Sequence, residues 1–207
     1  MGDYRTKQEE FWARSFGSEY IGRNSDGEMV SRLLPFWSDI MRRAGGVSSV
    51  LELGSNIGLN LRALKMLSPA IELSAVEINE TSAGILREWG GCEVFQKSIL
   101  DFEPSRTWEL VFTRGVLIHI NPDELPGVYD MMTKVSSRCI LIAEYYNPVP
   151  VEVPYRGNDG FLFKRDFAGE IMDRTDSLRL VDYGFVYHRD PIFPQDDITW
   201  FLLERVK

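Results

Sequence analysis

In this 207-residue chain, the most informative segment is Val50-Leu-Glu-Leu-Gly-Ser-Asn-Ile-Gly-Leu-Asn60. It starts as an apolar, strand-like run, passes through Gly54 and Gly58, and continues into a helical pattern. Glycine lets the chain turn sharply and lets backbone N–H groups come close to a ligand. A strand, a glycine-containing turn and a helix in this order predict an α/β domain with a ligand site at the carboxyl end of that strand.

The chain from residue 47 onward repeats this alternation of strand and helix. Further helices are predicted over Thr81–Trp89, Pro122–Val135 and Phe167–Asp173, the last two with Asn121 and Asp166 as their N-caps. Such alternation is typical of a parallel sheet that is covered on both faces. The predicted strands are Val50–Leu53, Ile71–Ile78, Glu93–Phe95, Glu109–Thr113 and Cys139–Glu144.

Two β-rich segments close the chain, Leu178–Tyr187 and Thr199–Arg205, and they lie near enough in sequence to form an antiparallel pair. Before them, residues 145–157 hold three prolines and several tyrosines. Proline excludes a helix here, and so many tyrosines are unusual for a bare linker. We therefore expect a loop on the substrate side.

The first 46 residues stand outside the alternation. They form two aromatic-rich, helix-like segments separated by Gly22–Gly27. These segments either cover one edge of the sheet or lie over the ligand crevice as a lid. We divide the chain into a helical lid or extension over residues 1–46 and a single compact unit over residues 47–207.

Composition excludes several classes of protein. The longest apolar runs are far shorter than a membrane span requires, and the charged N-terminus MGDYRTKQEEFW is unlike a signal peptide, so a cytoplasmic protein is expected. The net charge of −8 disfavours nucleic acid as a partner. Two cysteines that are far apart and two histidines make a metal site improbable. A small-molecule substrate is the remaining expectation.

Glu77 supports a nucleoside as the ligand. It ends the second predicted strand, 23 residues after Gly54, where an acidic side chain can accept hydrogen bonds from both hydroxyls of a ribose. The segment lacks the third glycine of the dinucleotide motif and the Gly-Lys-Ser/Thr of a phosphate-binding loop. An adenosine nucleoside is therefore favoured over NAD or ATP.

These features resemble the class I S-adenosylmethionine (SAM)-dependent methyltransferases. The family's first motif, acidic-x-Gly-x-Gly-x-Gly, reads Glu52-Leu-Gly-Ser-Asn-Ile-Gly58 here, with Asn56 at the middle glycine. Asn tolerates positive φ better than most residues. Glu77, Ser98-Ile99 and the block Phe112–Ile120 match three further marks in order. The resemblance implies a Rossmann-like, seven-stranded, mostly parallel sheet with an antiparallel C-terminal strand pair.

The resemblance also implies SAM as the cofactor. It places Ser98 and the N–H of Ile99 against the adenine, and the backbone of Arg114 beside the methionine part. In the lid interpretation, polar groups at the end of the first helical segment meet the ligand carboxylate. The predicted cofactor-binding residues are Glu52, Gly54, Asn56, Gly58, Glu77, Ile78, Ser98, Ile99, Arg114, Tyr20 and Arg23.

A narrower resemblance spans nearly the whole chain. The motifs Gln8-Glu-Glu-Phe-Trp12, Glu144-Tyr-Tyr-Asn-Pro148, Pro154-Tyr-Arg-Gly157, Phe163-Lys-Arg-Asp-Phe-Ala-Gly169 and Asp182-Tyr-Gly-Phe-Val-Tyr-His-Arg-Asp190 look like the methylases associated with pseudaminic acid biosynthesis. This likeness implies methyl transfer to a small acceptor, such as a nonulosonic sugar or its precursor.

Candidate catalytic residues follow from the chemistry. A hydroxyl or ammonium acceptor must lose a proton to a base, and aromatic faces attract a sulfonium by cation–π interaction. Arginines suit an acidic sugar because they bind carboxylates in two-pronged geometry. The catalytic candidates are Tyr145, Asn147, His119, His188 and Glu144. The substrate-binding candidates are Tyr146, Tyr155, Arg156, Arg165 and Arg189.

Two other functions stay open. The same fold and cofactor would serve an enzyme that encloses SAM so that its own amine attacks the γ-carbon, as in the azetidine-2-carboxylate synthases, with methylthioadenosine as the second product. A catalytically silent SAM-binding protein is the other alternative.

Overall fold

The computed structural model describes residues 4–22 and 28–206. Its main feature is a seven-stranded sheet in the order β3-β2-β1-β4-β5-β9-β8. The first five strands in the chain run parallel, and β9 is antiparallel to both of its neighbours, β5 and β8. The strands are β1 (Ser49–Leu53), β2 (Glu72–Val76), β3 (Glu93–Phe95), β4 (Trp108–Arg114), β5 (Ser136–Glu144), β8 (Leu178–Val186) and β9 (Ile198–Arg205).

This sheet confirms the predicted strands and the antiparallel closing pair. A separate two-stranded sheet is formed by β6 (Val151–Glu152) and β7 (Phe163–Lys164). The prediction of a loop over residues 145–157 missed β6, and no strand was predicted at β7. Two-residue strands carry too few residues for a period-two pattern to show.

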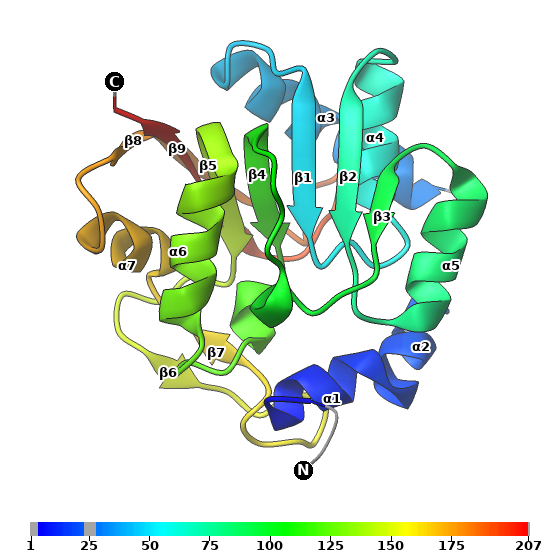
Figure 1. The fold of residues 1–207 in the computed structure, drawn as a ribbon, viewed down its shortest axis with the longest axis vertical. Coiled ribbons are helices and arrows are strands. Elements are labelled where there is room, and N and C mark those ends of the chain that lie inside the picture. Colours follow the sequence, from blue (N-terminus) through cyan, green and yellow to red (C-terminus); the bar gives the residue numbers. More distant parts are fainter. Residues whose placement is uncertain (1–3, 23–27, 207) are drawn as a thin grey trace.

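Helices cover both faces of the sheet (Figure 1). One hydrophobic cluster joins the sheet to α3 (Glu28–Arg43), α4 (Leu59–Leu67) and α5 (Glu80–Trp89). The second joins the opposite face to α6 (Leu125–Val135) and α7 (Phe167–Asp173). Two single 3₁₀ turns, η1 (Ile99–Asp101) and η2 (Leu117–His119), follow β3 and β4.

Helix starts differ from the prediction at two places. The N-cap of α5 is Asn79, whose Oδ1 accepts a hydrogen bond from the Ser82 N–H at 3.1 Å, so the helix begins before Thr81. Asn121 does not cap α6. Its side chain accepts from the Asp123 N–H at 3.0 Å and forms a local turn, and the helix begins only at Leu125. The predicted cap of α7, Asp166, is confirmed.

The N-terminal segment divides into two parts. The short helices α1 (Lys7–Ala13) and α2 (Ser15–Ile21) lie beneath the carboxyl ends of the strands (Figure 1). In contrast, α3 packs into the main core, where Trp37 and Ile40 are completely buried. The two short helices and α3 therefore lie against different parts of the sheet, and a lid function for residues 1–46 stays a prediction.

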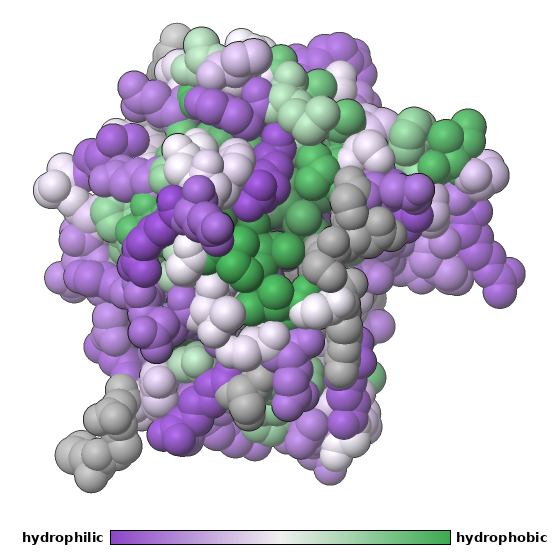
Figure 2. Space-filling view, turned by 90° about the vertical axis from the view of Figure 1, so that its right-hand side faces the viewer, coloured by the Kyte–Doolittle hydropathy of each residue, from purple (hydrophilic) through white to green (hydrophobic). Residues whose placement is uncertain are grey.

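Hydrophobic and hydrophilic residues are separated on the surface of the molecule. Seen from the α5 side, hydrophobic residues gather at the centre of the molecule's face and hydrophilic residues surround them (Figure 2). Within residues 4–22 and 28–206, no helix combines the length and the apolar character needed to cross a membrane.

Candidate active site

A cavity of about 450 Å³ lies at the carboxyl ends of β1, β2 and β4. Its walls come from the glycine-containing turn after β1, the ends of β2 and β4, the η1 and η2 turns, α1, α3 and the loop between β8 and β9. The first five strands of the sheet are parallel, so their carboxyl ends meet at this edge, as in other open α/β sheets that bind ligands.

The turn after β1 has an unusual backbone. Gly54, Asn56 and Gly58 have φ values of 76°, 48° and 77°. A Cβ atom on Gly54 would lie 2.8 Å from Cγ2 of Val116, so glycine is required there by both conformation and space. Asn56 adopts the left-handed conformation that the motif's middle glycine would otherwise supply.

Glu77 is held in the cavity by backbone hydrogen bonds. Its Oε2 accepts from the Asn56 N–H at 2.6 Å and its Oε1 accepts from the Asn79 N–H at 2.7 Å. Burial raises the pKa of this carboxyl, and the backbone N–H groups oppose that effect. Each carboxylate oxygen has a further lone pair, so the side chain can accept from two more donors, such as a pair of ribose hydroxyls.

Glu52, on β1, is the second buried acid of the cavity. Its Oε1 accepts from Nδ2 of Asn60 at 2.7 Å, whereas Oε2 has no hydrogen-bond partner among the described residues. The residue is 2% exposed, and burial raises its pKa to about 8. A buried acceptor without a partner is costly, so this carboxyl suits a cationic or hydrogen-bond-donating ligand group.

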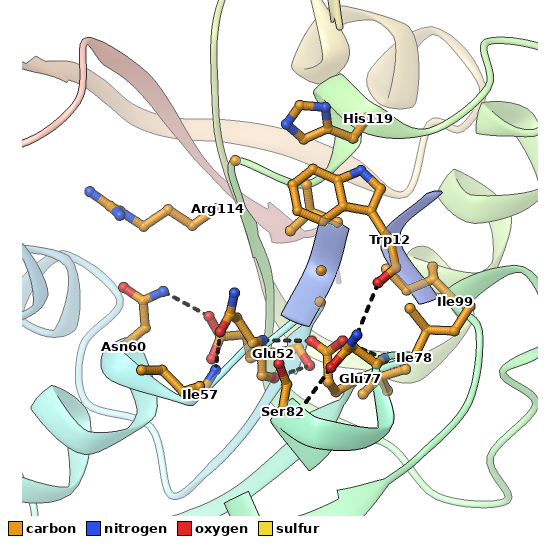
Figure 3. A pocket seen from close by; sticks show the side chains of 18 of the residues that line it. Trp12, Glu52, Ile57, Asn60, Glu77, Ile78, Ser82, Ile99, Arg114 and His119 are labelled. Carbon is orange, nitrogen blue, oxygen red and sulfur yellow. Dashed lines mark hydrogen bonds between the residues drawn. The ribbon is translucent and has the colours of Figure 1, made fainter. Parts of the chain in front are cut away.

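The two ends of the cavity differ in character (Figure 3). At one end lie the apolar side chains of Ile78 and Ile99, next to Ser98, whose hydroxyl caps η1 by accepting from the Leu100 N–H at 3.1 Å. Arg114 lies toward the other end. A flat apolar group such as a purine fits the first end, and a carboxylate fits the second.

Trp12 and His119 form the wall opposite Glu52 and Glu77 (Figure 3). Their ring centroids are 4.7 Å apart, and the ring of Tyr155 lies 4.7 Å from His119 and 6.4 Å from Trp12. Nδ1 of His119 donates to the Phe161 carbonyl at 2.6 Å. Burial lowers the pKa of His119 to about 4, so the ring is neutral near pH 7 and its Nε2 is a hydrogen-bond acceptor.

The predicted catalytic loop after β5 does not line the cavity. Glu144 is 2% exposed and accepts from the backbone N–H groups of Val116 and Leu117, both at 3.1 Å, so it anchors the chain that enters η2. Burial raises its pKa to about 7. Tyr145 packs against both hydrophobic clusters, with the Lys164 ammonium 5.4 Å from its ring centre.

The remaining candidates are spread over the surface near β6 and β7. Tyr146 is 40% exposed, and Nδ2 of Asn147 donates to the Val149 carbonyl at 2.6 Å. Arg165 pairs with Glu170 at 2.7 Å. Catalytic and substrate-binding roles for these residues stay predictions.

Three arginines and a tyrosine complete the predicted set. The Arg156 guanidinium lies 5.6 Å from the ring centre of Tyr155, and Arg189 is exposed. The side chain of Tyr20 and the whole of Arg23 lie outside the described parts of the chain. Of the predicted cofactor-binding residues, the cavity brings together Glu52, Gly54, Asn56, Glu77, Ile78, Ser98, Ile99 and Arg114.

No protein-family model matches the sequence, and no curated protein matches it. Solved structures do match. Magnesium protoporphyrin IX methyltransferase from Synechocystis PCC 6803, with bound SAM, is 11% identical, with a TM-score of 0.70 and 100% of each chain covered. This chain therefore has the fold of a methyltransferase. The plantazolicin methyltransferase BpumL, in complex with S-adenosylhomocysteine (SAH), is 10% identical with a TM-score of 0.68, and the match covers 97% of this chain and 94% of that chain. N-methyltransferase NodS from Bradyrhizobium japonicum WM9, also with SAH, is 14% identical with a TM-score of 0.65, and the match covers 91% of this chain and 98% of that chain.

The methyltransferase fold also gives places in the cavity to residues that sequence reasoning did not select. Gln8 and Trp12, which the sequence indicates only as members of the motif Gln8-Glu-Glu-Phe-Trp12, both line the cavity. Asn60 and Asn79 also line the cavity and were not predicted, although Asn60 follows Gly58 and Asn79 follows Glu77 by two residues. A signal for Asn79 was available, because asparagine directly before a helix is a preferred N-cap.

Proposed function

We propose that this chain is an SAM-dependent methyltransferase that acts on a small acceptor. The observation that carries the proposal is the pair of buried carboxylates, Glu52 and Glu77, on either side of a turn with positive φ at Gly54. Both carboxylate oxygens of Glu77 accept from backbone N–H groups, and Oε2 of Glu52 has no hydrogen-bond partner among the described residues. The fold shared with SAM-bound and SAH-bound methyltransferases supports it.

The residues of the cavity suit each part of SAM. Glu77 would bind the ribose hydroxyls, and Ile78 and Ile99 would flank the adenine. Glu52 would accept from the ammonium group, and Arg114 would bind the carboxylate. When bound, SAM supplies a methyl group on a sulfonium, which is activated for transfer to a nucleophile.

The chain itself contributes alignment and the exclusion of water. The positive charge of the sulfonium is lost during transfer, so a low-dielectric, water-poor cavity favours the transition state. Trp12 and His119 enclose the cavity opposite the two acids. Gln8, one helical turn before Trp12, fastens α1 by donating from Nε2 to the Gly160 carbonyl at 2.8 Å.

For the acceptor we propose a small molecule bearing a carboxylate, of the nonulosonic sugar class. Arg32 lines the cavity and is linked to Arg114 through Gln195, which accepts from Arg114 and donates to the Arg32 carbonyl. The Arg32 guanidinium, which pairs with the exposed Glu28 at 2.9 Å, supports an acidic acceptor group beside the SAM carboxylate that Arg114 would bind. The likeness of the sequence to the methylases of pseudaminic acid biosynthesis supports the sugar.

The size of the cavity favours a second candidate, the intramolecular reaction of SAM. About 450 Å³ lies in the lower part of the usual range for a small-molecule site, and its α1 wall is fastened to the 160–161 segment. One enclosed ligand whose own amine displaces methylthioadenosine would need no acceptor.

Mass spectrometry of the products separates these functions. The protein is incubated with SAM alone and then with SAM and sugar acids. SAH formed only with an acceptor supports methyl transfer, and methylthioadenosine formed with SAM alone supports the intramolecular reaction. Calorimetry with SAH provides the underlying control, because a dissociation constant weaker than about 1 mM would reject SAM as the ligand.

A further inference from the structure

The loop between β8 and β9 returns to the cavity and is fastened there. Gln195 accepts from Nη2 of Arg114 at 2.8 Å and donates from its own Nε2 to the Arg32 carbonyl at 3.1 Å. Its backbone N–H donates to the Tyr187 carbonyl at 3.4 Å, which closes the loop on itself. The loop is therefore tied to both β4 and α3, and His188, Pro194, Gln195 and Asp196 line the cavity.

Within this loop, His188 is oriented by Asp197. The carboxylate accepts from the His188 backbone N–H at 3.0 Å and lies 2.8 Å from Nδ1 of the ring. A carboxylate only accepts hydrogen bonds, so Nδ1 carries the proton of the neutral ring. Nε2 is then left unprotonated, as a base requires.

The two histidines of the chain have opposite environments. His119 is buried, faces a backbone carbonyl through Nδ1, and its pKa is lowered to about 4. His188 has a half-exposed side chain and a carboxylate partner. A carboxylate stabilises the imidazolium that forms when the ring takes a proton, and exposure lets that proton pass to water. His188 is therefore the better base.

Other charged groups act on the pair. Lys164, on β7, interacts electrostatically with Asp197 and lowers the pKa of that carboxyl, although the His188 backbone N–H lowers it more. Asp190, in the same loop, accepts from the backbone N–H groups of Ile192 and Phe193. Asp197 is thus the carboxylate in direct contact with the His188 ring.

Resting on the proposed methyl transfer, we propose that His188 is the general base, that Asp197 is its positioning residue, and that the acceptor is a hydroxyl compound. An amine already has a free lone pair once it is neutral, whereas a hydroxyl must give up its proton as it attacks. The hydroxyl oxygen forms its bond to the methyl carbon while the carbon–sulfur bond breaks, and the electron pair of that bond stays on the sulfur of SAH. The hydroxyl proton passes to Nε2 of His188 and then to water.

The first test needs neither SAM nor an acceptor. Nitrogen-15 NMR of the full chain, titrated with acid, follows His188 and His119 separately. Neutral His188 should carry its proton on Nδ1, where Asp197 accepts it, and Asp197→Ala should move part of that proton to Nε2 while leaving the tautomer of His119 unchanged. The same tautomer of His188 in both proteins, or a proton on Nε2 in the wild type, overturns the proposal.

The second test measures SAH formation with matched probes that all bear the proposed carboxylate, 4-hydroxybenzoate and 4-(hydroxymethyl)benzoate against 4-aminobenzoate and 4-(aminomethyl)benzoate. Transfer to the hydroxyl probes is expected, with kcat/KM rising through the His188 pKa found by NMR. His188→Gln should lose about 100-fold or more in kcat/KM and the pH dependence with it, while SAH affinity stays within twofold. Asp197→Ala should lower kcat/KM by less than His188→Gln does and leave SAH affinity within twofold, because it removes only the group that orients the ring. Asp182→Asn, on β8 and outside the cavity, is the matched control and should change neither.

Transfer to the amines alone, or to none of the probes in a protein that binds SAH, overturns the assignment of the base and the acceptor class. A protein that does not bind SAH at all instead rejects the proposed function. The two failures are therefore distinguishable.

Discussion

Asn79 ties the N-terminal helices to the predicted ribose site through its side chain, whose Nδ2 donates to the Arg14 carbonyl at 3.2 Å. The same nitrogen lies 3.3 Å from the Ala13 carbonyl and 3.2 Å from the Ser18 hydroxyl. The Asn79 backbone N–H donates to Glu77. Asn79 therefore holds the junction between α1 and α2 and also orients Glu77, the residue predicted to bind the ribose.

The two functions of the Asn79 side chain can be separated. Asn79→Asp keeps an oxygen to cap α5 but places a carboxylate against backbone carbonyls, so we expect α1 and α2 to detach. Trypsin should cleave after Arg14 several times faster, and SAH affinity should fall about tenfold, because Trp12 lines the cavity. Asn79→Ser keeps the cap without the charge and should give a smaller effect. Unchanged cleavage and affinity in both variants would show that this contact does not hold the helices.

Glu77→Ala should weaken SAH binding by about 2–4 kcal/mol, because it removes charge-assisted hydrogen bonds and leaves the ribose hydroxyls without acceptors. That loss corresponds to a factor of about 30–1,000 in the dissociation constant measured by calorimetry. Glu77→Gln is the matched control, since it keeps the shape and one acceptor oxygen and should lose less. Circular dichroism checks that both variants are folded. Wild-type affinity in a folded alanine variant would reject the ribose assignment.

Glu52 should release a proton when SAM binds at pH 7. Its pKa of about 8 means that the carboxyl is largely protonated in the free protein, and a bound ammonium group would favour the charged form. Calorimetry in buffers of different ionisation enthalpy should show release of about one proton at pH 7 and almost none above pH 9. Glu52→Gln should abolish the release. The same release in that variant would assign the proton to another group.

Much of the fold could be predicted from the sequence, because the strands of the seven-stranded sheet are apolar runs and the turn after β1 contains two glycines. Gly54 and Asn56 show this at single residues, since the residue types best suited to positive φ stand where the backbone adopts it. Local patterns reach only a few residues along the chain, and these features are local.

The arrangement of the site was less predictable, because it depends on contacts between distant segments. Glu144 follows an apolar strand at the expected edge, but its side chain turns to the backbone of Val116 and Leu117, about 27 residues earlier. His188 and Asp197 meet only because β8 and β9 form a hairpin. No spacing rule within one segment indicates such pairings.

Gly54→Ala should destabilise the protein by about 1–3 kcal/mol, because its Cβ would contact Val116 and a φ of 76° is unfavourable for alanine. Adding Val116→Ala should remove the steric contact and restore that share of the unfolding free energy, whereas the share lost to the unfavourable φ should remain lost. Gly127→Ala, in α6, has open space and no positive φ, so it should be neutral or stabilising by about 0.5–1 kcal/mol. Guanidinium unfolding gives all three values. Equal effects at Gly54 and Gly127 would contradict this account.

Glu144 should make stability fall as pH rises. Burial raises its pKa in the folded protein to about 7 from an ordinary value of 4.5, so between these values the folded state binds more protons than the unfolded state. Its contribution to the unfolding free energy is therefore complete below about pH 4.5 and lost as pH passes through 7.

Glu144→Gln resembles the protonated acid, with a carbonyl oxygen for the N–H groups of Val116 and Leu117. Relative to the wild type, this variant should gain about 2–4 kcal/mol in unfolding free energy between pH 4.5 and pH 8. The comparison removes the opposite effect of His119, whose lowered pKa reduces stability as pH falls from about 6.5 to 4 in both proteins. A difference between the two proteins that does not change with pH would mean that Glu144 is ionised throughout, held by its three backbone donors.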